Sequence, residues 1–193
     1  MSIVTLVSGG LDSSLMAILA KENGQKQYPL FIDYGQLAAE KEWEACQKIH
    51  KKYDLPTPTK VDISGFGKTI PSGITNINFD IKKEAFLPGR NLIFLIIGAA
   101  YAIKKNAHAV CIGLLNEYTH IFPDQTNRFL YEAERIIEIS FGQKVNVVAP
   151  LMDLYKKDVI YLAKIKGING TYSCHSGRNK PCGKCISCEE FNF

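Results

Sequence analysis

A turn rich in glycine and serine near the start of the chain places the tightest limit on the fold. It consists of Ser8, Gly9, Gly10, Leu11, Asp12, Ser13 and Ser14. A short apolar run, Ile3 to Val7, precedes the turn, and apolar residues then recur at helical spacing until Gly24. A strand, a glycine turn and a helix in this order predict one unit of a parallel α/β sheet.

The residue types in this turn suit a phosphate group that is bound together with a metal ion. Glycine lets the backbone approach an anion closely, and the free N–H groups at the start of the helix can donate to it. Asp12 fits such a site if Mg²⁺ shares the phosphate, because carboxylate oxygens suit that ion. The two commoner nucleotide loops, Gly-x-x-x-x-Gly-Lys and Gly-x-Gly-x-x-Gly, do not match. The alternative is a plain glycine turn in which serine and aspartate cap a helix.

The rest of the chain alternates apolar runs with helical patterns. Strands are predicted at 28–33, 60–63, 109–113 and 145–148, and helices at 38–53, 91–105, 129–141 and 156–166. Pro29 is expected at the beginning of its strand, and residues 64–86 are predicted to form a long loop. The alternation predicts a Rossmann-like parallel sheet with helices on both faces over residues 1–168. Ligands are then expected beyond the carboxyl ends of the strands.

The last segment, 169–193, has no such pattern and is predicted to be a metal-binding appendage. Within fifteen residues it contains Cys174, Cys182, Cys185 and Cys188. Two Cys-x-x-Cys steps let four thiolates converge on one tetrahedral ion, which predicts a structural Zn²⁺ site. An iron–sulfur cluster or a redox-active cysteine pair is the alternative. His175 is expected to neighbour the ligands, although it could replace one of them.

Bulk composition sets wider limits. The chain has 193 residues and a net charge of +4, which fits a polyanionic ligand such as ATP. It has no dense basic stripe, so nucleic acid is not expected as a partner. The longest apolar stretch, 92–103, is too short to cross a bilayer, and no targeting segment is visible. We therefore expect a cytoplasmic protein without a membrane partner, either a monomer or a homodimer.

The phosphate-loop turn resembles that of the PP-loop ATP pyrophosphatases, which cleave ATP between the α and β phosphates. With the C-terminal cysteines, the chain resembles one family of that group, the 7-cyano-7-deazaguanine synthases of queuosine biosynthesis. Residues 86–91 look like the family's Pro-Gly-Arg-Asn motif, and residues 33–36 look like its Tyr-x-Gln segment. Gly113 with 123–124, and 150–151 with Lys156, match the register of two further motifs.

This resemblance implies a reaction and a set of site residues. ATP would adenylate the carboxylate of 7-carboxy-7-deazaguanine, ammonia would give an amide, and a second activation would give the nitrile. The implied cofactors are ATP and Mg²⁺, with an adenine nucleotide alpha hydrolase-like fold. The implied catalytic residues are Ser8, Asp12, Ser13, Arg90 and Lys156. The implied binding residues are the seven of the turn with Asp33, Tyr34, Gln36, Pro88, Gly89, Arg90, Asn91, Gly113, Phe122 and Asp124.

Physical roles accompany these assignments. Arg90 offers a bidentate cation for phosphate or carboxylate, and Asn91 can cap the helix that follows it. Lys156 is a mobile charge suited to a leaving phosphate, but it equally suits a solvated helix face. Stacking on a planar base is expected from Tyr34, Tyr118 and Phe122.

The chain departs from the family in its substrate half. Leu37 and Ala38 stand where the family has Arg-His. Within 118–126, Tyr118 replaces an aspartate and Gln125 replaces a cysteine. Such changes alter hydrogen bonds to the base or to the activated carboxyl group, and a site built on polar pairing discriminates strongly.

Three other functions therefore stay open beside the synthase. The chain could resemble antiphage-defence relatives that make a deazaguanine amide or join deazaguanine to a protein partner. It could act on tRNA, as other PP-loop proteins do. It could also be a nucleotide-binding remnant without activity, although the presence of Ser8, Asp12, Arg90 and Lys156 argues against this.

Overall fold

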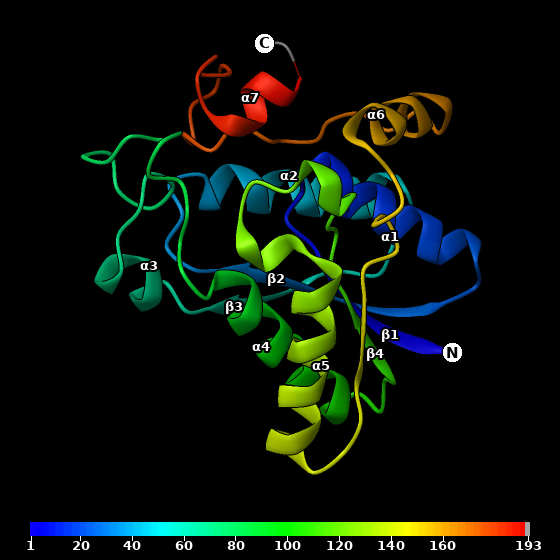
Figure 1. Cartoon of the computed structure of the whole chain (residues 1–193). Helices are drawn as coiled ribbons and strands as arrows, with labels where there is room; N and C mark the ends of the chain where they lie inside the picture. The colour runs from blue at the N-terminus through cyan, green and yellow to red at the C-terminus, as the bar shows by residue number, and fades with distance from the viewer. Residues whose placement is uncertain (192–193) are drawn as a thin grey trace.

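The computed structural model, which describes residues 1–191, contains one sheet of five parallel strands in the order β3-β2-β1-β4-β5 (Figure 1). The strands are β1 (Ser2–Leu6), β2 (Lys26–Asp33), β3 (Thr59–Asp62), β4 (Ala109–Cys111) and β5 (Asn146–Val148). The chain moves outward from β1 to β2 and β3, and then returns to place β4 on the other side of β1. Ligands of open α/β sheets bind where the strand order reverses in this way. The predicted parallel α/β fold is confirmed.

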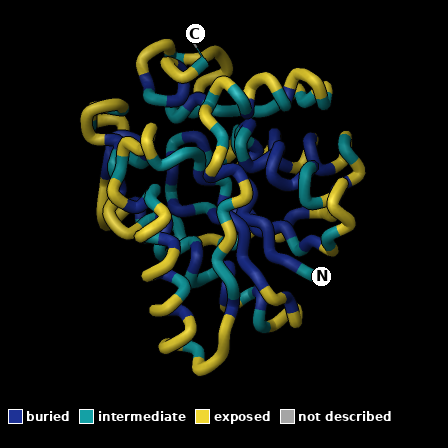
Figure 2. The backbone as a smooth tube through the Cα atoms, turned by 45° about the vertical axis from the view of Figure 1, so that its right-hand side comes forward, coloured by how far each residue is buried: buried dark blue, intermediate teal, exposed yellow. Residues whose placement is uncertain are grey.

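Helices cover both faces of the sheet. They are α1 (Leu11–Glu22), α2 (Ala39–Lys52), α3 (Gly65–Thr69), α4 (Arg90–Lys104), α5 (Asn127–Phe141), α6 (Lys156–Ile165) and α7 (Ile186–Glu190), with the short 3-10 helices η1 (Glu117–Thr119) and η2 (Pro123–Gln125). On one face of the sheet, Val4 and Leu6 of β1 pack against buried residues of α4 and α5. The opposite face contacts α1 and α6 through Ile3. Successive residues of β1 thus point to opposite faces. Figure 2 shows buried residues at the centre of the molecule, where the strands β1, β2 and β4 are mostly buried.

The predicted strands and helices are present, and their ends lie close to the predicted ones. The prediction of a loop over 64–86 is wrong at its beginning, where α3 forms. A contact with a distant residue stabilises this turn of helix, because Gly67 N–H donates to the Tyr34 carbonyl at 3.0 Å. A Cβ atom at Gly67 would lie 2.3 Å from that same oxygen, so only glycine permits the approach.

The expectation that Pro29 begins a strand is also wrong. Pro29 lies within β2 and pairs in register with Thr5. The neighbouring Leu30 directs its carbonyl to β1, where it accepts from Val7 N–H at 3.0 Å. The nitrogen of Pro29 therefore faces the other side, and there the pairing with β3 begins only at Leu30. No sheet hydrogen bond is lost at this proline.

The C-terminal segment lies across the carboxyl ends of the strands, next to α2 and α6 (Figure 1). Tyr172 N–H donates to the Gly9 carbonyl at 3.0 Å, and Asn169 N–H donates to the Tyr53 hydroxyl at 3.0 Å. The division into a domain over 1–168 and an appendage over 169–193 stays a prediction, and its last two residues lie outside the described ones. Within residues 1–191, no helix is long and apolar enough to cross a membrane.

Gly98 of α4 offers a test of the packing between α4 and the sheet. A Cβ atom there would lie 2.5 Å from Val110 Cγ2 and 3.2 Å from Leu6 Cδ2. Gly98→Leu should lower the free energy of unfolding by roughly 1–3 kcal/mol, because side chains inserted into a packed core force strain. Ala100→Leu is the matched control, since Ala100 lies on the exposed side of the same helix. Urea denaturation should show a change of only about 0.5 kcal/mol for the control. Equal stability of the two variants would contradict this packing.

Candidate functional site

A cavity of about 310 Å³ opens at the carboxyl ends of the central strands. The phosphate-loop turn, defined as residues 8–14, forms one wall. Side chains from α2, α4 and the C-terminal segment form the others. The cavity therefore lies where the reversal of strand order predicts a ligand site.

Gly9 holds the phosphate-loop turn against α2. Its φ angle is +78°, and an added Cβ atom would lie 2.5 Å from the Glu42 carbonyl oxygen and 2.6 Å from the Cys46 nitrogen. Any side chain at this position would push the turn away from α2. Gly9 does not itself line the cavity, so its contribution is to fix the path of the backbone.

Serine hydroxyls set the shape of the turn. Ser8 N–H donates to Ser13 Oγ at 3.2 Å, and the two hydroxyl oxygens lie 3.1 Å apart. The Ser14 hydroxyl donates to the Gly10 carbonyl at 2.7 Å, and Ser14 does not line the cavity. The first turn of α1 begins directly after Gly10, and the N–H groups of Leu11 and later residues leave an anion site at its N-terminus.

Lys156 lies beside this anion site and joins two acidic groups. Its Nζ atom is 3.0 Å from both carboxylate oxygens of Asp12 and 3.0 Å from Glu190 Oε2. Burial lowers the pKa of Lys156, but Asp12 and Glu190 outweigh this, so the pKa rises above its ordinary value and the ammonium stays charged. The side chain is only 19% exposed, which rules out the alternative of a solvated helix face.

Arg90 approaches the cavity from the beginning of α4. Its Cζ atom lies 5.7 Å from the centre of the Tyr34 ring and 6.0 Å from that of Phe94. Burial raises the pKa of Tyr34 to about 12, although the positive charge of Arg90 acts against this. Nε of Arg90 is buried and has no hydrogen-bond partner among residues 1–191. The two ring centres are themselves 5.2 Å apart, so the guanidinium lies over both rings from one side and keeps a free donor.

The prediction that Asn91 caps α4 is wrong. Gly89 precedes the helix with a φ angle of +78°, in the left-handed region that favours glycine. Asn91 lies inside the first turn, and its Nδ2 donates to the Asp124 carbonyl at 3.1 Å. This hydrogen bond ties the start of α4 to η2, so Asn91 places the segment that contains Phe122.

A carboxylate that the sequence did not single out lies in the same cavity. Glu42 extends from α2, and its Oε2 accepts from Gln36 Nε2 at 2.9 Å. Burial raises the pKa of Glu42 to about 7, although Gln36 and Arg90 act to lower it. No sequence pattern separates Glu42 from Glu40 and Glu44 of the same charged helix.

The C-terminal segment adds further side chains that the sequence did not place in this cavity. Tyr172, Ser173, His175 and Glu190 line the cavity. Burial, together with the positive charges of Arg90 and Lys156, lowers the pKa of His175 to about 4. The imidazole is therefore neutral at physiological pH, and its buried Nδ1 has no partner among the described residues.

The structure gathers many of the predicted site residues around the cavity. Those that line it are Ser8, Gly10, Leu11, Asp12, Ser13, Tyr34, Gln36, Arg90, Asn91, Gly113, Phe122 and Lys156. Those that do not are Gly9, Ser14, Asp33, Pro88, Gly89 and Asp124. Asp33 instead pairs with Lys60 at 2.8 Å and accepts from Gly35 N–H at 3.1 Å. The expectation that Tyr118 forms a wall is wrong, because this residue is 86% exposed.

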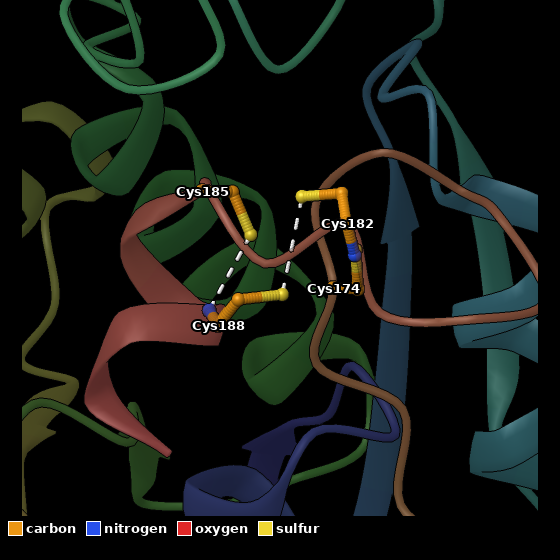
Figure 3. A group of neighbouring side chains, drawn as sticks. All are labelled: Cys174, Cys182, Cys185 and Cys188. Carbon is orange, nitrogen blue, oxygen red and sulfur yellow. Dashed lines mark hydrogen bonds between the residues drawn. The ribbon is translucent and has the colours of Figure 1, made fainter. Parts of the chain in front are cut away.

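The four C-terminal cysteines point toward one centre (Figure 3). All four sulfur atoms lie within 4.8 Å of one another, and Cys182 Sγ is 3.9 Å from Cys188 Sγ. A tetrahedral zinc ion with sulfur ligands at about 2.3 Å requires sulfur–sulfur distances of about 3.8 Å. The donor set and the spacing therefore fit a tetrahedral metal ion.

Comparisons with known proteins identify the family. A family model described as "Queuosine biosynthesis protein QueC" matches residues 2–191. A 7-cyano-7-deazaguanine synthase of a Nitratiruptor species is 31% identical, over 97% of this chain and 90% of that protein. The enzyme of the same name from Campylobacter jejuni is 32% identical, over 95% and 88%.

Solved structures support the fold alone, because their identities are low. A predicted tRNA methyltransferase subunit from Methanocaldococcus jannaschii aligns with a TM-score of 0.61 and 17% identity, over 85% of this chain and 74% of that one. The U34-tRNA thiolase NcsA from Methanococcus maripaludis, solved with its [4Fe-4S] cluster, aligns with a TM-score of 0.59 and 16% identity, over 99% and 63%. The match of the family model over nearly all described residues, with these relatives, shows that the chain belongs to the QueC family of queuosine biosynthesis proteins.

Proposed function

We propose that this protein is an ATP-dependent synthase that converts 7-carboxy-7-deazaguanine and ammonia to 7-cyano-7-deazaguanine. The observation that supports this most is the meeting of an anion-binding helix start with Asp12, Lys156 and Arg90 in one cavity. The names of the relatives supply the product, 7-cyano-7-deazaguanine. We further propose that residues 1–168 form the ATP-binding α/β domain of a cytoplasmic protein, to which residues 169–193 are appended.

The proposed reaction consists of two activations by ATP, each followed by the loss of AMP. A carboxylate oxygen of the acid attacks the α-phosphorus of ATP, and pyrophosphate leaves. Ammonia then attacks the activated carbonyl carbon, and AMP leaves to give the amide. The amide oxygen then attacks the α-phosphorus of a second ATP, and pyrophosphate leaves. The C–O bond breaks, the oxygen departs with AMP, and the loss of two protons from the amide nitrogen gives the nitrile. No covalent bond to the protein forms in any step.

The residues around the cavity suit the work of holding two anions together. The N–H groups at the start of α1 would bind phosphate oxygens, and Lys156 would offset the charge of the leaving pyrophosphate. Arg90 keeps a free N–H donor and would bind the carboxylate of the acid. Asp12 would hold Mg²⁺, which neutralises phosphate charge when it is bound.

Turnover with the acid tests the proposal directly. Incubation with 7-carboxy-7-deazaguanine, ammonia and Mg-ATP should yield 7-cyano-7-deazaguanine with AMP and pyrophosphate, as measured by mass spectrometry of the small molecules. Asp12→Asn should lower kcat by about 100- to 1000-fold, because it weakens the ligand proposed for the Mg²⁺ ion that offsets the charge of the reacting phosphate. Asp54→Asn is the matched control, since this side chain is 98% exposed.

A product that stops at the amide, or a mass added to a protein, would replace the proposed product. No ATP cleavage would contradict the proposal.

Arg90→Lys tests the need for a planar cation. Lysine keeps the positive charge but cannot present a planar group to the two rings or donate in a fork. We expect kcat/KM for the acid to fall roughly 10- to 100-fold, the effect of about 1.4–2.8 kcal/mol of lost transition-state binding. Steady-state kinetics should show no such loss for Arg135→Lys, whose side chain is 57% exposed. Equal kinetics of the two variants would exclude a role for the guanidinium.

We also propose that the four cysteines bind one structural Zn²⁺ ion. Elemental analysis of the purified protein should find one zinc per chain, and Cys182→Ser should lose it because a ligand is removed. Cys111→Ala, which changes a cysteine outside the cluster, should keep the metal. Iron with visible absorbance would identify an iron–sulfur cluster and exclude zinc.

A further inference from the structure

Glu42 is the acidic group of the cavity that the proposed reaction does not use. Asp12 and Glu190 share the ammonium of Lys156, but Glu42 receives only the amide of Gln36. Within residues 1–191, its second oxygen, Oε1, has no hydrogen-bond partner. A carboxylate has about four positions at which it can accept a hydrogen bond, so most of the capacity of Glu42 is unused.

The surrounding hydrogen bonds fix what Glu42 can accept. The backbone N–H of Tyr34 can only donate a hydrogen bond, and it donates to Gln36 Oε1 at 2.9 Å. The oxygen of the Gln36 amide therefore faces Tyr34, and its NH₂ group must face Glu42. Glu42 accepts this hydrogen bond, and the amide holds the carboxylate in one orientation. The oxygens of Glu42 are thus placed before any ligand arrives.

The charges near Glu42 favour a ligand that donates hydrogen bonds. Burial works against the ionised carboxylate, and Asp33 adds to this, whereas Arg90 and Gln36 favour it. Among the ion pairs of residues 1–191, none joins Arg90 to Glu42. Two N–H donors from a neutral ligand would satisfy the carboxylate without bringing in another charge.

The walls near this carboxylate suit a flat ring. Tyr34 and Phe94 have their ring centres 5.2 Å apart, and Phe86 stacks on Phe122 at 5.1 Å. Three of these four rings, those of Tyr34, Phe94 and Phe122, line the cavity. Aromatic walls beside a fixed carboxylate match a planar heterocycle that carries N–H groups on one edge.

We propose that Glu42 determines specificity for the base by accepting hydrogen bonds from two adjacent N–H groups of a guanine-type ring. The ring nitrogen N–H and the 2-amino group present this donor pair on one edge. Oε1 accepts one of the two donors, and the remaining lone pair of Oε2 accepts the other. The inference rests on the proposed function for the identity of the base, and it assigns to Glu42 a role apart from the transfer of the nucleotide.

Equilibrium binding of two small bases tests this role without any need for turnover. Titration calorimetry compares 7-deazaguanine with 7-deazahypoxanthine, which lacks only the 2-amino group. The wild-type protein should bind the amino-bearing base about 5- to 150-fold more tightly, as for a good bidentate pair. Glu42→Gln should reduce this preference to less than about twofold, because its amide presents NH₂ where the base also presents donors.

Controls separate this effect from damage to the protein. Glu44→Gln removes an acidic group of the same helix whose side chain is 54% exposed, and should leave the preference unchanged. The affinity for ATP, measured in the same way, should be the same in all three proteins. If Glu42→Gln does not fold, Glu42→Asp gives the same test, because it withdraws both oxygens by one methylene and should lower the preference at least about fivefold.

Several outcomes would overturn the inference. One is a preference that survives in Glu42→Gln. Another is a variant that loses affinity for ATP alone, which would indicate that Glu42 binds the adenine of ATP. A third is a variant that changes only the KM for ammonia, which would make Glu42 a site for ammonium. Turnover of the acid with any of these results would leave the proposed function intact. A preference that depends on Glu42, without turnover of the acid, would support the inference and contradict the proposed function.

Discussion

The contact of Gly9 with α2 joins three parts of the chain at one residue. The backbone of α2 passes so close to Gly9 that a Cβ atom would lie 2.5 Å from the Glu42 carbonyl. From the other side, Tyr172 of the C-terminal segment donates its N–H to the Gly9 carbonyl. The turn between β1 and α1 therefore cannot move independently of α2 or of the C-terminal segment. The cavity depends on this contact, because each of the three parts supplies some of its walls.

The cysteine cluster is connected to the anion site through α7 and two ion pairs of Lys156. Cys185 and Cys188 lie at the start and in the middle of α7, and Glu190 ends this helix. Glu190 contacts Lys156 at 3.0 Å, and Lys156 contacts Asp12 of the phosphate-loop turn. A metal ion that holds the four sulfurs would fix α7, and α7 carries Glu190 to the site. The two halves of the sequence pattern, glycine turn and cysteines, are thus physically connected.

Local patterns were sufficient for most of the fold, but they failed where a distant contact decided the outcome. The strand and helix periodicities predicted the sheet, because alternate burial leaves a direct trace in the order of the residues. The turn of α3 was missed because it depends on the close approach of Gly67 to the Tyr34 carbonyl. Pro29 was misplaced because the sequence does not show where β3 begins to pair with β2. The sequence predicts a helix cap at Asn91, and this is wrong because its partner, the Asp124 carbonyl, is distant in sequence.

The sequence by itself determined the chemistry of the parts: an anion-binding helix start, a bidentate cation at Arg90, four converging thiolates and the family. These depend on residue types at short spacings, which the chain order fixes. Only the tertiary structure decided which charges meet. It paired Lys156 with Glu190 as well as Asp12, it placed Tyr118 outside the cavity, and it selected Glu42 from a helix of similar acidic residues. The physical reason is that burial and the distance between charges set these roles, and both arise only when separate elements pack together.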